Sequence, residues 1–356
     1  MGLPTGTRNF TYAQDMAIFR TRTHWVLLAI FLVILLTVPL YIEYFPEGNY
    51  WLGIINLTCI TIIGATGLNI LTGYCGQLSI GHAGFMAVGA YTSAIVNSRL
   101  GVPFPLALVL AGLTAGFIGM IFGLPSLRVK GFYLAISTIA AQFIILWVID
   151  HWTDVTGGSN GMSVPHMSIG SLHLDSQSAQ FYFIIAIAIL TIYFAMNLAR
   201  TRVGKALIAI RDNDLAAEVM GINLFRYKLL AFFIGCFIAG VAGCLMAYWT
   251  RYLTTQSFTF SVSILYVAMI IIGGLGTTLG PILGAIFIRV LEVLITKEIS
   301  PALQNAFPQL PGGFTSGIAP LLFGLAIILF LIFEPRGLAH RWQLIKSSYR
   351  VWPFSY

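Results

Sequence analysis

The amino-acid sequence predicts an all-α, polytopic membrane protein with about eight to ten transmembrane helices. Of its 356 residues, 58% are hydrophobic and only 9% are charged, whereas soluble domains carry roughly 25% charged residues. Apolar runs of about twenty residues recur along the whole chain, and each run is long enough to span about 30 Å of hydrocarbon. This composition leaves no room for a large soluble domain.

We predict ten crossings. The first apolar run is too long for the core of a signal peptide, and no cleavage site of small residues follows it, so it is expected to be a membrane anchor. The runs at 82–98 and 281–297 are short, so each is either a crossing or a re-entrant segment. The predicted crossings are 25–42, 51–72, 82–98, 104–126, 132–149, 179–199, 228–249, 259–275, 281–297 and 318–334.

The distribution of basic residues predicts that both ends of the chain lie in the cytoplasm. Lys and Arg gather on the cytoplasmic segments of multi-pass proteins. With the N-terminus inside, fifteen of the nineteen Lys and Arg residues fall on inside segments, while Arg99 and Arg251 lie outside. The chain therefore divides into a cytoplasmic N-terminal segment (1–24), a transmembrane domain (25–334) and a basic cytoplasmic tail (335–356). This asymmetry accounts for the net charge of +7 without a nucleic-acid partner.

The inside segment 200–228 is rich in charge. It holds six Lys and Arg residues and three acidic residues. Its middle part, 214–221, has a helix-forming sequence with a small apolar face, for which Asp214 suits the N-cap and Gly221 the C-terminal end. Such a segment predicts a docking surface for a soluble partner, and the alternative is a solvated, positively charged loop.

Two glycine-rich breaks interrupt the apolar pattern, the first at 71–85 and the second at 272–284. Backbone that leaves a helix at membrane depth must be buried in protein or line a wet cavity, because lipid cannot satisfy its N–H and C=O groups. Paired breaks in a transporter point to the substrate path, although small residues also permit close helix packing. A lone histidine in such a break is equally consistent with a structural hydrogen bond. The path candidates are Gln77, Ser79, His82, Gly273, Gly274 and Gly276.

Two predicted outer loops are long enough to contact an external partner. The loop at 150–177 has no Lys or Arg and contains Thr156-Gly-Gly-Ser-Asn-Gly161, so Thr156, Ser159 and Asn160 are candidate docking residues. The loop at 298–316 contains three prolines and a pair of glycines. For both loops the alternative is an ordinary surface connection.

The sequence argues against an enzyme. Arg289 and Glu292, the charged cluster within a crossing, are three residues apart on one predicted helix, which favours a self-contained ion pair. The pair Gly204-Lys205 is followed by Ala206 and therefore is not a P-loop, so any ATP must be hydrolysed by another protein. The four cysteines show neither disulfide nor metal spacing, and we expect them to be buried packing residues. No cofactor and no metal are predicted.

Five blocks of the sequence resemble the permease subunits of bacterial ATP-binding-cassette (ABC) importers for branched-chain amino acids. They occur in the order found in that family, and the second and third blocks favour the M-type (LivM-like) over the H-type subunit. The blocks are Gly76–Tyr91, Gly123–Ile136, Thr156–Gly161, Ala209–Gly221 and Glu334–Leu338.

The resemblance implies the ABC importer permease fold and a place in the bacterial cytoplasmic (inner) membrane, with leucine, isoleucine or valine as cargo. It implies a second, H-type permease subunit in a heterodimer, two cytoplasmic ABC ATPases, and a periplasmic or extracellular substrate-binding protein, besides membrane lipid. It also implies that 214–221 is the helix that couples the chain to an ATPase. The coupling candidates are Arg211, Asp212, Asp214, Leu215, Glu218, Met220 and Gly221.

Two alternatives stay open at this point. Importers that resemble this chain also carry urea, short amides or aromatic acids, so the substrate is not fixed by the sequence. A secondary carrier that works without ATPases is the other alternative, and it would not need the surface at 214–221.

Overall fold

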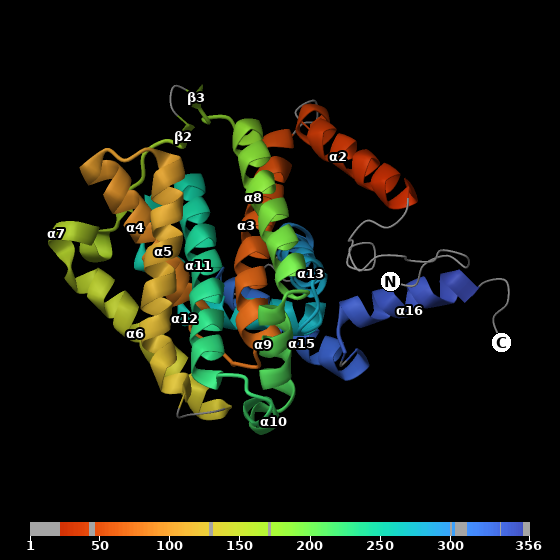
Figure 1. Cartoon of the computed structure of the whole chain (residues 1–356). Coiled ribbons are helices and arrows are strands. Elements are labelled where there is room, and N and C mark those ends of the chain that lie inside the picture. The colour runs from red at the N-terminus through yellow and green to blue at the C-terminus, as the bar shows by residue number, and fades with distance from the viewer. Residues whose placement is uncertain are drawn as a thin grey trace.

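The computed structural model describes residues 22–42, 47–127, 131–169, 172–299, 301–302, 312–334 and 336–351. Over these residues the regular secondary structure is helical apart from two small pairs of strands, so the predicted all-α fold is confirmed (Figure 1). The longer helices are α2 (Arg22–Ile42), α3 (Gly48–Leu68), α4 (His82–Leu100), α5 (Phe104–Gly123), α6 (Phe132–His151), α8 (Gln177–Leu198), α9 (Arg202–Asp212), α11 (Leu224–Thr250), α12 (Phe260–Gly273), α13 (Gly280–Leu294), α15 (Gly312–Phe333) and α16 (Leu338–Val351).

Short elements join these helices. Two stretches of π-helix extend α3 and α13, at Asn69–Tyr74 and Ile295–Ile299. Single turns of 3₁₀-helix lie at Leu124–Leu127, Gly158–Asn160 and Thr255–Phe258. The short α-helices are α7 (Thr153–Thr156) and α10 (Asp214–Val219). Antiparallel pairing joins β1 (Met162–Ser163) to β4 (Tyr252–Leu253) and β2 (Ser168–Ile169) to β3 (Leu172–His173).

The chain is a multi-pass membrane protein. Six described helical stretches are long and apolar enough to cross a membrane, or seven if 321–333 and 338–348, which meet at a bend of 42°, form one span. Each of the six coincides with a predicted crossing. They are Gly48–Tyr74, Phe104–Gly123, Phe132–His151, Gln177–Leu198, Leu224–Thr250 and Thr255–Gly273.

The structure has fewer candidate spans than the ten predicted crossings, partly because the two short predicted runs, 82–98 and 281–297, are not among them. Helix α4 fills the range 82–98, but Ser, Thr, Asn and Arg side chains in its C-terminal half make it less apolar than the six stretches. Helix α13 has 15 residues and contains Arg289 and Glu292. Helix α2 is present in the range of the first predicted crossing. Residues 1–21 of the predicted N-terminal segment, and residues 300 and 303–311 of the loop at 298–316, lie outside the described residues.

Helix α11 is the centre of the bundle, and α3, α4 and α5 pack around it. Small residues allow these helices to approach closely, as is common in membranes. A Cβ atom added to Gly89 of α4 would overlap the backbone of Gly240 on α11, and one added to Gly243 would overlap the backbone of Met86. The four cysteines are buried, as predicted. At these positions α4 and α11 are packed by close backbone contact.

The outer helices present large apolar side chains to their surroundings. Phe117 of α5, Phe143 and Trp147 of α6, and Leu190 of α8 are each more than half exposed. A soluble protein rarely leaves so many large apolar groups in water. Lipid or another membrane subunit therefore covers these faces.

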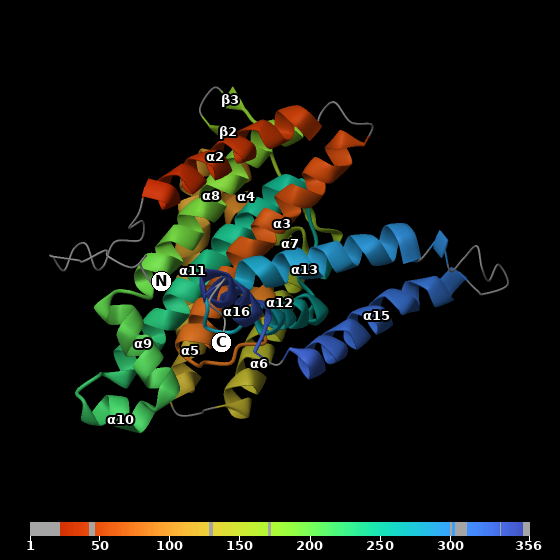
Figure 2. The same cartoon turned by 90° about the vertical axis from the view of Figure 1, so that its right-hand side faces the viewer.

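The two ends of the bundle carry different structures. Helix α10 projects from one end, and the β2–β3 hairpin lies at the opposite end in both views (Figures 1 and 2). Helices α13 and α15 cross the direction of α3 and α11 (Figure 2). Arg289 ties α13 to α3, because it pairs with Glu292 at 2.5 Å and donates to the Thr61 hydroxyl at 3.0 Å. The predicted ion pair is therefore present, and it also links two helices.

Candidate functional site

The first glycine-rich break follows directly from α3. The helix widens into the π-helical turn Asn69–Tyr74, and the chain then runs without regular structure to α4 at His82. Gly76 has a φ of +71°, a conformation that suits glycine. The Gly76 and Gln77 amides donate back to the carbonyls of Thr72 and Leu71, at 3.1 and 3.2 Å. The break therefore begins as a tight, hydrogen-bonded end of α3.

The rest of this break is bound by polar side chains of α6 and α12. The Ile80 amide donates to the Thr138 hydroxyl at 3.0 Å, and the Ala83 amide donates to the Ser263 hydroxyl at 2.9 Å. Ser263 in turn donates to the Gln142 side chain at 2.8 Å, and Gln142 donates to the Phe258 carbonyl at 2.9 Å. These side chains supply the acceptors that water or a regular helix would otherwise give to the freed amides.

The three path candidates in this break are all buried. His82 donates through Nε2 to the Gly64 carbonyl at 2.8 Å. This is the structural hydrogen bond that the sequence offered as the alternative to a role in the path. Its Nδ1 and the Ser79 hydroxyl have no hydrogen-bond partner among the described residues. Gln77 lines a cavity that is described below. Their contact with cargo stays a prediction.

The second break connects α12 to α13. Gly273 and Gly284 pack where the two helices touch, so a Cβ at either would overlap the neighbouring backbone. The Thr277 hydroxyl donates to the Gly274 carbonyl at 2.8 Å and accepts the Gly280 amide at 3.0 Å, which closes the loop on itself. Gly276 has a φ of +75°. Of the second-break candidates, Gly273 thus serves helix packing, while Gly274 and Gly276 form the loop.

The structure brings the two breaks together at what we call the junction, formed by Asn69, Gly73, Gly276, Thr277 and Arg211. Asn69 is buried, and its side chain donates to the Thr277 carbonyl and accepts the Gly276 amide, both at 2.9 Å. Arg211 donates through Nη1 to the Gly73 carbonyl at 2.9 Å. Two segments about 200 residues apart in sequence are therefore joined by one amide side chain.

Arg211 fills the space beside glycines of both breaks. A Cβ at Gly76 would lie 2.9 Å from Arg211 Cγ, and a Cβ at Gly276 would lie 2.7 Å from Arg211 Nη1. The other face of the guanidinium is held by Asp212, whose Oδ1 accepts from Nε at 3.0 Å and Nη2 at 2.8 Å. A cation at the C-terminal end of α3 also matches the helix dipole. Arg211 therefore points toward the breaks rather than only toward solvent.

Helices α9 and α10 build the charged segment. Helix α9 buries Leu207 and Ile210 against the bundle, and the Thr201 hydroxyl caps its first turn. Helix α10 is capped by the Asn213 side chain, which accepts the Ala216 amide at 3.1 Å. The predicted N-cap, Asp214, is wrong by one residue, because Asn213 has the extended backbone that an N-cap requires. Gly221, with a φ of +84°, ends the helix as predicted.

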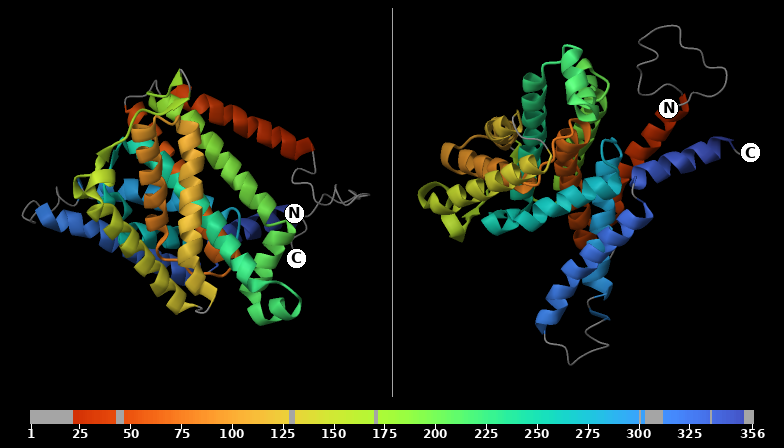
Figure 3. Two further views of the ribbon diagram at one scale, coloured as in Figure 1. Left: turned by 60° about the vertical axis from the view of Figure 1, so that its left-hand side comes forward. Right: turned by 90° about the horizontal axis from the view of Figure 1, so that it is seen from below.

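The outer face of α10 is apolar and exposed. Leu215, Val219 and Met220 are 67%, 86% and 82% exposed, and Glu218 and Asp212 are exposed beside them. Ala217 is buried and holds the helix to the bundle. Figures 1 and 3 show α10 as the tip of the molecule at that end. Such a small apolar patch with a charged border is typical of a protein docking surface.

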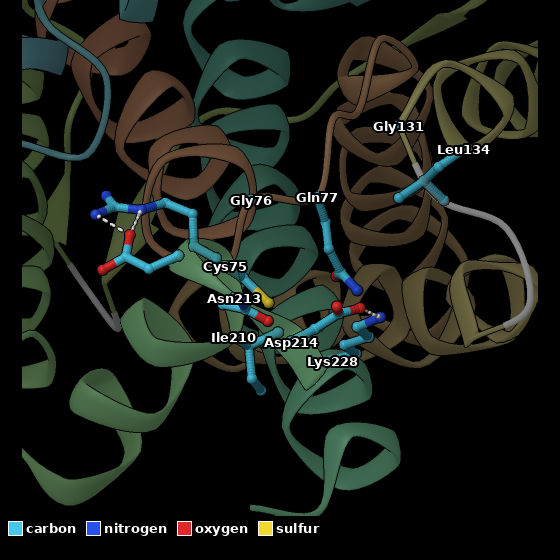
Figure 4. A pocket seen from close by; sticks show the side chains of 11 residues that line it. Cys75, Gly76, Gln77, Gly131, Leu134, Ile210, Asn213, Asp214 and Lys228 are labelled. Atoms are coloured by element: carbon cyan, nitrogen blue, oxygen red, sulfur yellow. Dashed lines mark hydrogen bonds and ion pairs between the residues drawn. The ribbon is translucent and has the colours of Figure 1, made fainter. Parts of the chain in front are cut away.

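A cavity of about 380 Å³ lies between α10 and the first break (Figure 4). It is lined by Cys75, Gly76, Gln77, Gly131, Leu134, Ile210, Arg211, Asp212, Asn213, Asp214 and Lys228. Lys228 of α11 is buried, and its Nζ lies 3.9 Å from the Asp214 carboxylate. Figure 4 shows Gln77 directed toward this ion pair from the break. The cavity therefore separates the first residue of α10 from the polar end of the first break.

The loop with the Thr-Gly-Gly-Ser-Asn-Gly sequence is a folded unit. The Thr156 hydroxyl is buried, donates to the Ile149 carbonyl at 2.6 Å and accepts the Gly158 amide at 3.1 Å. The Tyr252 hydroxyl donates to the Asn160 carbonyl. Ser159 and Asn160 are exposed. Of the three docking candidates, the structure leaves these two accessible, whereas Thr156 holds the loop in shape.

Several residues that shape the site were not singled out from the sequence. Asn69 and Gln142 are polar side chains within apolar runs, which is the signal that could have identified them. Thr138 and Ser263 give no such signal, because their hydroxyls also occur where they bond only to their own helix. Among the described residues, no group of His, Cys, Asp or Glu could hold a metal ion.

Comparison with known proteins gives a consistent picture. A family model described as branched-chain amino acid transport system / permease component matches residues 50–331. The high-affinity branched-chain amino acid transport system permease protein LivM of Escherichia coli K12 is 31% identical over 309 residues, which cover 80% of this chain and 69% of LivM. The probable LivM of Methanocaldococcus jannaschii is 27% identical over 65% of this chain and 67% of its own length. LivH of Escherichia coli K12 is 24% identical over 79% of this chain and 92% of LivH. No solved structure matches.

The hydrogen bonds of the first break predict a difference between two threonines. Thr138→Val removes the acceptor of the Ile80 amide, whereas Thr66→Val removes only a bond from a buried hydroxyl to its own helix. A buried amide without a partner costs about 1–3 kcal/mol, so Thr138→Val is expected to lower the stability in detergent by that amount more than Thr66→Val. Thermal unfolding of the purified variants measures this difference. Equal losses would contradict the assignment of Thr138 as a partner of the break.

Proposed function

Because this chain belongs to the branched-chain amino acid transport permease family, we propose that it forms half of the translocation path of an ATP-driven importer for leucine, isoleucine and valine. The observation that carries the proposal is the exposed apolar face of α10, set on a segment whose Arg211 reaches both glycine-rich breaks. A secondary carrier has no use for such a surface. An importer driven by separate ATPases needs one.

The partners follow from this assignment. A second permease subunit of the LivH type completes the path, two ABC ATPases bind at the α10 end, and a substrate-binding protein docks at the opposite end. Ser159 and Asn160, which are exposed, are the residues that we expect to contact the binding protein. The faces of α5, α6 and α8, with their exposed aromatic and aliphatic side chains, suit lipid or the second subunit.

The orientation in the membrane is part of the proposal. The α10 end carries the charged segment 200–228, and basic segments of multi-pass proteins lie in the cytoplasm. The α10 face is therefore cytoplasmic, the loop at 150–177 is external, and both termini are cytoplasmic. In a bacterium this is the inner membrane.

The mechanism is alternating access. ATP binding closes the partner ATPases, and their motion displaces α10. Rigid-body rocking of helix bundles then opens the path to one side of the membrane at a time. A zwitterionic amino acid needs no fixed counter-charge in such a path, because the dipoles of broken helices and neutral donors such as Gln77 can solvate it.

Uptake by cells that lack only this chain tests the proposed cargo. We expect the deletion to abolish the part of labelled leucine uptake that unlabelled valine competes away, and reintroduction of the chain to restore it. Urea and benzoate, added as competitors to the parent strain, probe the other substrate classes of similar importers. Leucine uptake unchanged by the deletion, or competition by urea or benzoate rather than valine, would contradict the branched-chain assignment.

The α10 face generates a separate prediction. Val219 is 86% exposed, so Val219→Asp should leave the fold intact while placing a charge in the proposed contact with the ATPase. Burial of such a side chain contributes about 1.5–3 kcal/mol. We expect Val219→Asp to reduce co-purification of the ATPases and ATP-driven uptake by roughly tenfold or more, and Val219→Leu to retain both.

The expression level and melting temperature of the two Val219 variants serve as the control for folding. Normal uptake by Val219→Asp, at normal expression, would contradict the assignment of α10 as the site of ATPase contact.

A further inference from the structure

The junction does more than pack the two breaks against each other. Asn69 belongs to the end of α3, and it holds both the amide of Gly276 and the carbonyl of Thr277. Any displacement of the last turn of α3 therefore carries the α12–α13 loop with it. Gly273 and Gly284 bring the backbones of α12 and α13 into close contact, so the two helices are packed directly against each other beside this loop.

Arg211 extends this chain of contacts to the surface. It is the second-last residue of α9, and one residue, Asn213, separates that helix from α10. Its Nη1 atom donates to the Gly73 carbonyl, and Asp212 fixes the orientation of the guanidinium. The chain leaves the helix after Tyr74, so the last carbonyls of α3 need donors from outside the helix. Arg211 supplies one of these donors from the segment that bears α10.

From this geometry we propose that Arg211 and Asn69 form a hydrogen-bonded linkage that makes the α9–α10 segment and both glycine-rich breaks move as one unit. Arg211 is thus a positioning residue: it transmits motion from α10 and does not itself contact the ATPase or the cargo. The inference rests on the proposed function, since the linkage needs a partner that displaces α10.

The glycines of the breaks support this reading. Gly76 and Gly276 have positive φ angles, and the Arg211 side chain occupies the space where their Cβ atoms would be. The side chain is 35% exposed, so part of it faces solvent while its Nη1 end lies between the two breaks. A charged side chain that served solubility alone would gain nothing from this position. The C-terminal segment adds to the same unit, because Gly337 packs directly on Gly274.

The experiment measures nucleotide-dependent exposure of the second break in the complete importer, reconstituted in nanodiscs. Leu275 is 43% exposed and lies in the second break, and the four native cysteines are buried, so Leu275→Cys provides one reactive thiol in the described structure. Its rate of modification by a maleimide is measured without nucleotide and with ATP and vanadate. ATP hydrolysis by the same preparations is measured in parallel, without vanadate.

We expect nucleotide to change the modification rate about fivefold or more, the size typical of allosteric coupling. Arg211→Gln should remove this change while the ATPases still bind and hydrolyse ATP. Arg211→Lys, which keeps a cationic donor for the Gly73 carbonyl, should restore at least part of it. Arg202→Gln, the same substitution at an exposed position at the other end of α9, is the matched control and should leave the change intact.

A second variant keeps the test decisive where Arg211→Gln fails to assemble. Asn69→Leu removes both hydrogen bonds to the second break, lies far from α10 in the chain of contacts, and should also remove the nucleotide response. A nucleotide response that survives both Arg211→Gln and Asn69→Leu, or that is lost equally in Arg202→Gln, would overturn the linkage. Failure of the unsubstituted chain to bind the ATPases would instead contradict the proposed function.

Discussion

Lipid offers no hydrogen-bond partner to backbone that leaves a helix, and the arrangement of this molecule depends on that constraint. The chain breaks its helices twice at glycine-rich segments, and each break must find partners within the protein. Thr138 and Ser263 satisfy amides of the first break, and Asn69 satisfies the second. These three side chains belong to α6, α12 and the end of α3, so each of their bonds also ties a break to another part of the bundle.

The rest of the bundle is held differently. Around α11, glycine and alanine bring backbones into direct contact, which makes a dense unit with little freedom to rearrange. The breaks, by contrast, are held by individual hydrogen bonds, and one of these comes from Arg211 beside the exposed helix α10. A dense bundle, two hydrogen-bonded breaks and an exposed apolar tip are the parts that an externally driven transporter requires. In the proposed function, the partners that drive transport are separate ATPases, which are inferred from the family to which the chain belongs.

Sequence patterns were sufficient for the parts that depend on local composition. Apolar runs, the two breaks, the end of α10 at Gly221 and the buried cysteines all follow from residue type and spacing. The number of spans was over-predicted, because α4 carries several polar side chains and α13 is short and contains two charged residues, so neither is long and apolar enough to count as a span. The junction could not be predicted from the sequence either. The contacts of Asn69 with Gly276 and of Arg211 with Gly73 are tertiary contacts between segments far apart in sequence. Asn213 replaced Asp214 as the N-cap because backbone conformation, rather than side-chain type, decided between two suitable residues.

In the proposed complex, α10 receives the ATPase while the opposite end of the bundle receives the binding protein. Site-specific photo-crosslinking in intact cells tests it most directly, with a photoreactive residue placed at Met220 or at Ser159, both of which are exposed. We expect position 220 to crosslink to the cytoplasmic ATPase and position 159 to crosslink to the external substrate-binding protein. Crosslinks in the reverse order, or an ATPase crosslink at neither position, would contradict it.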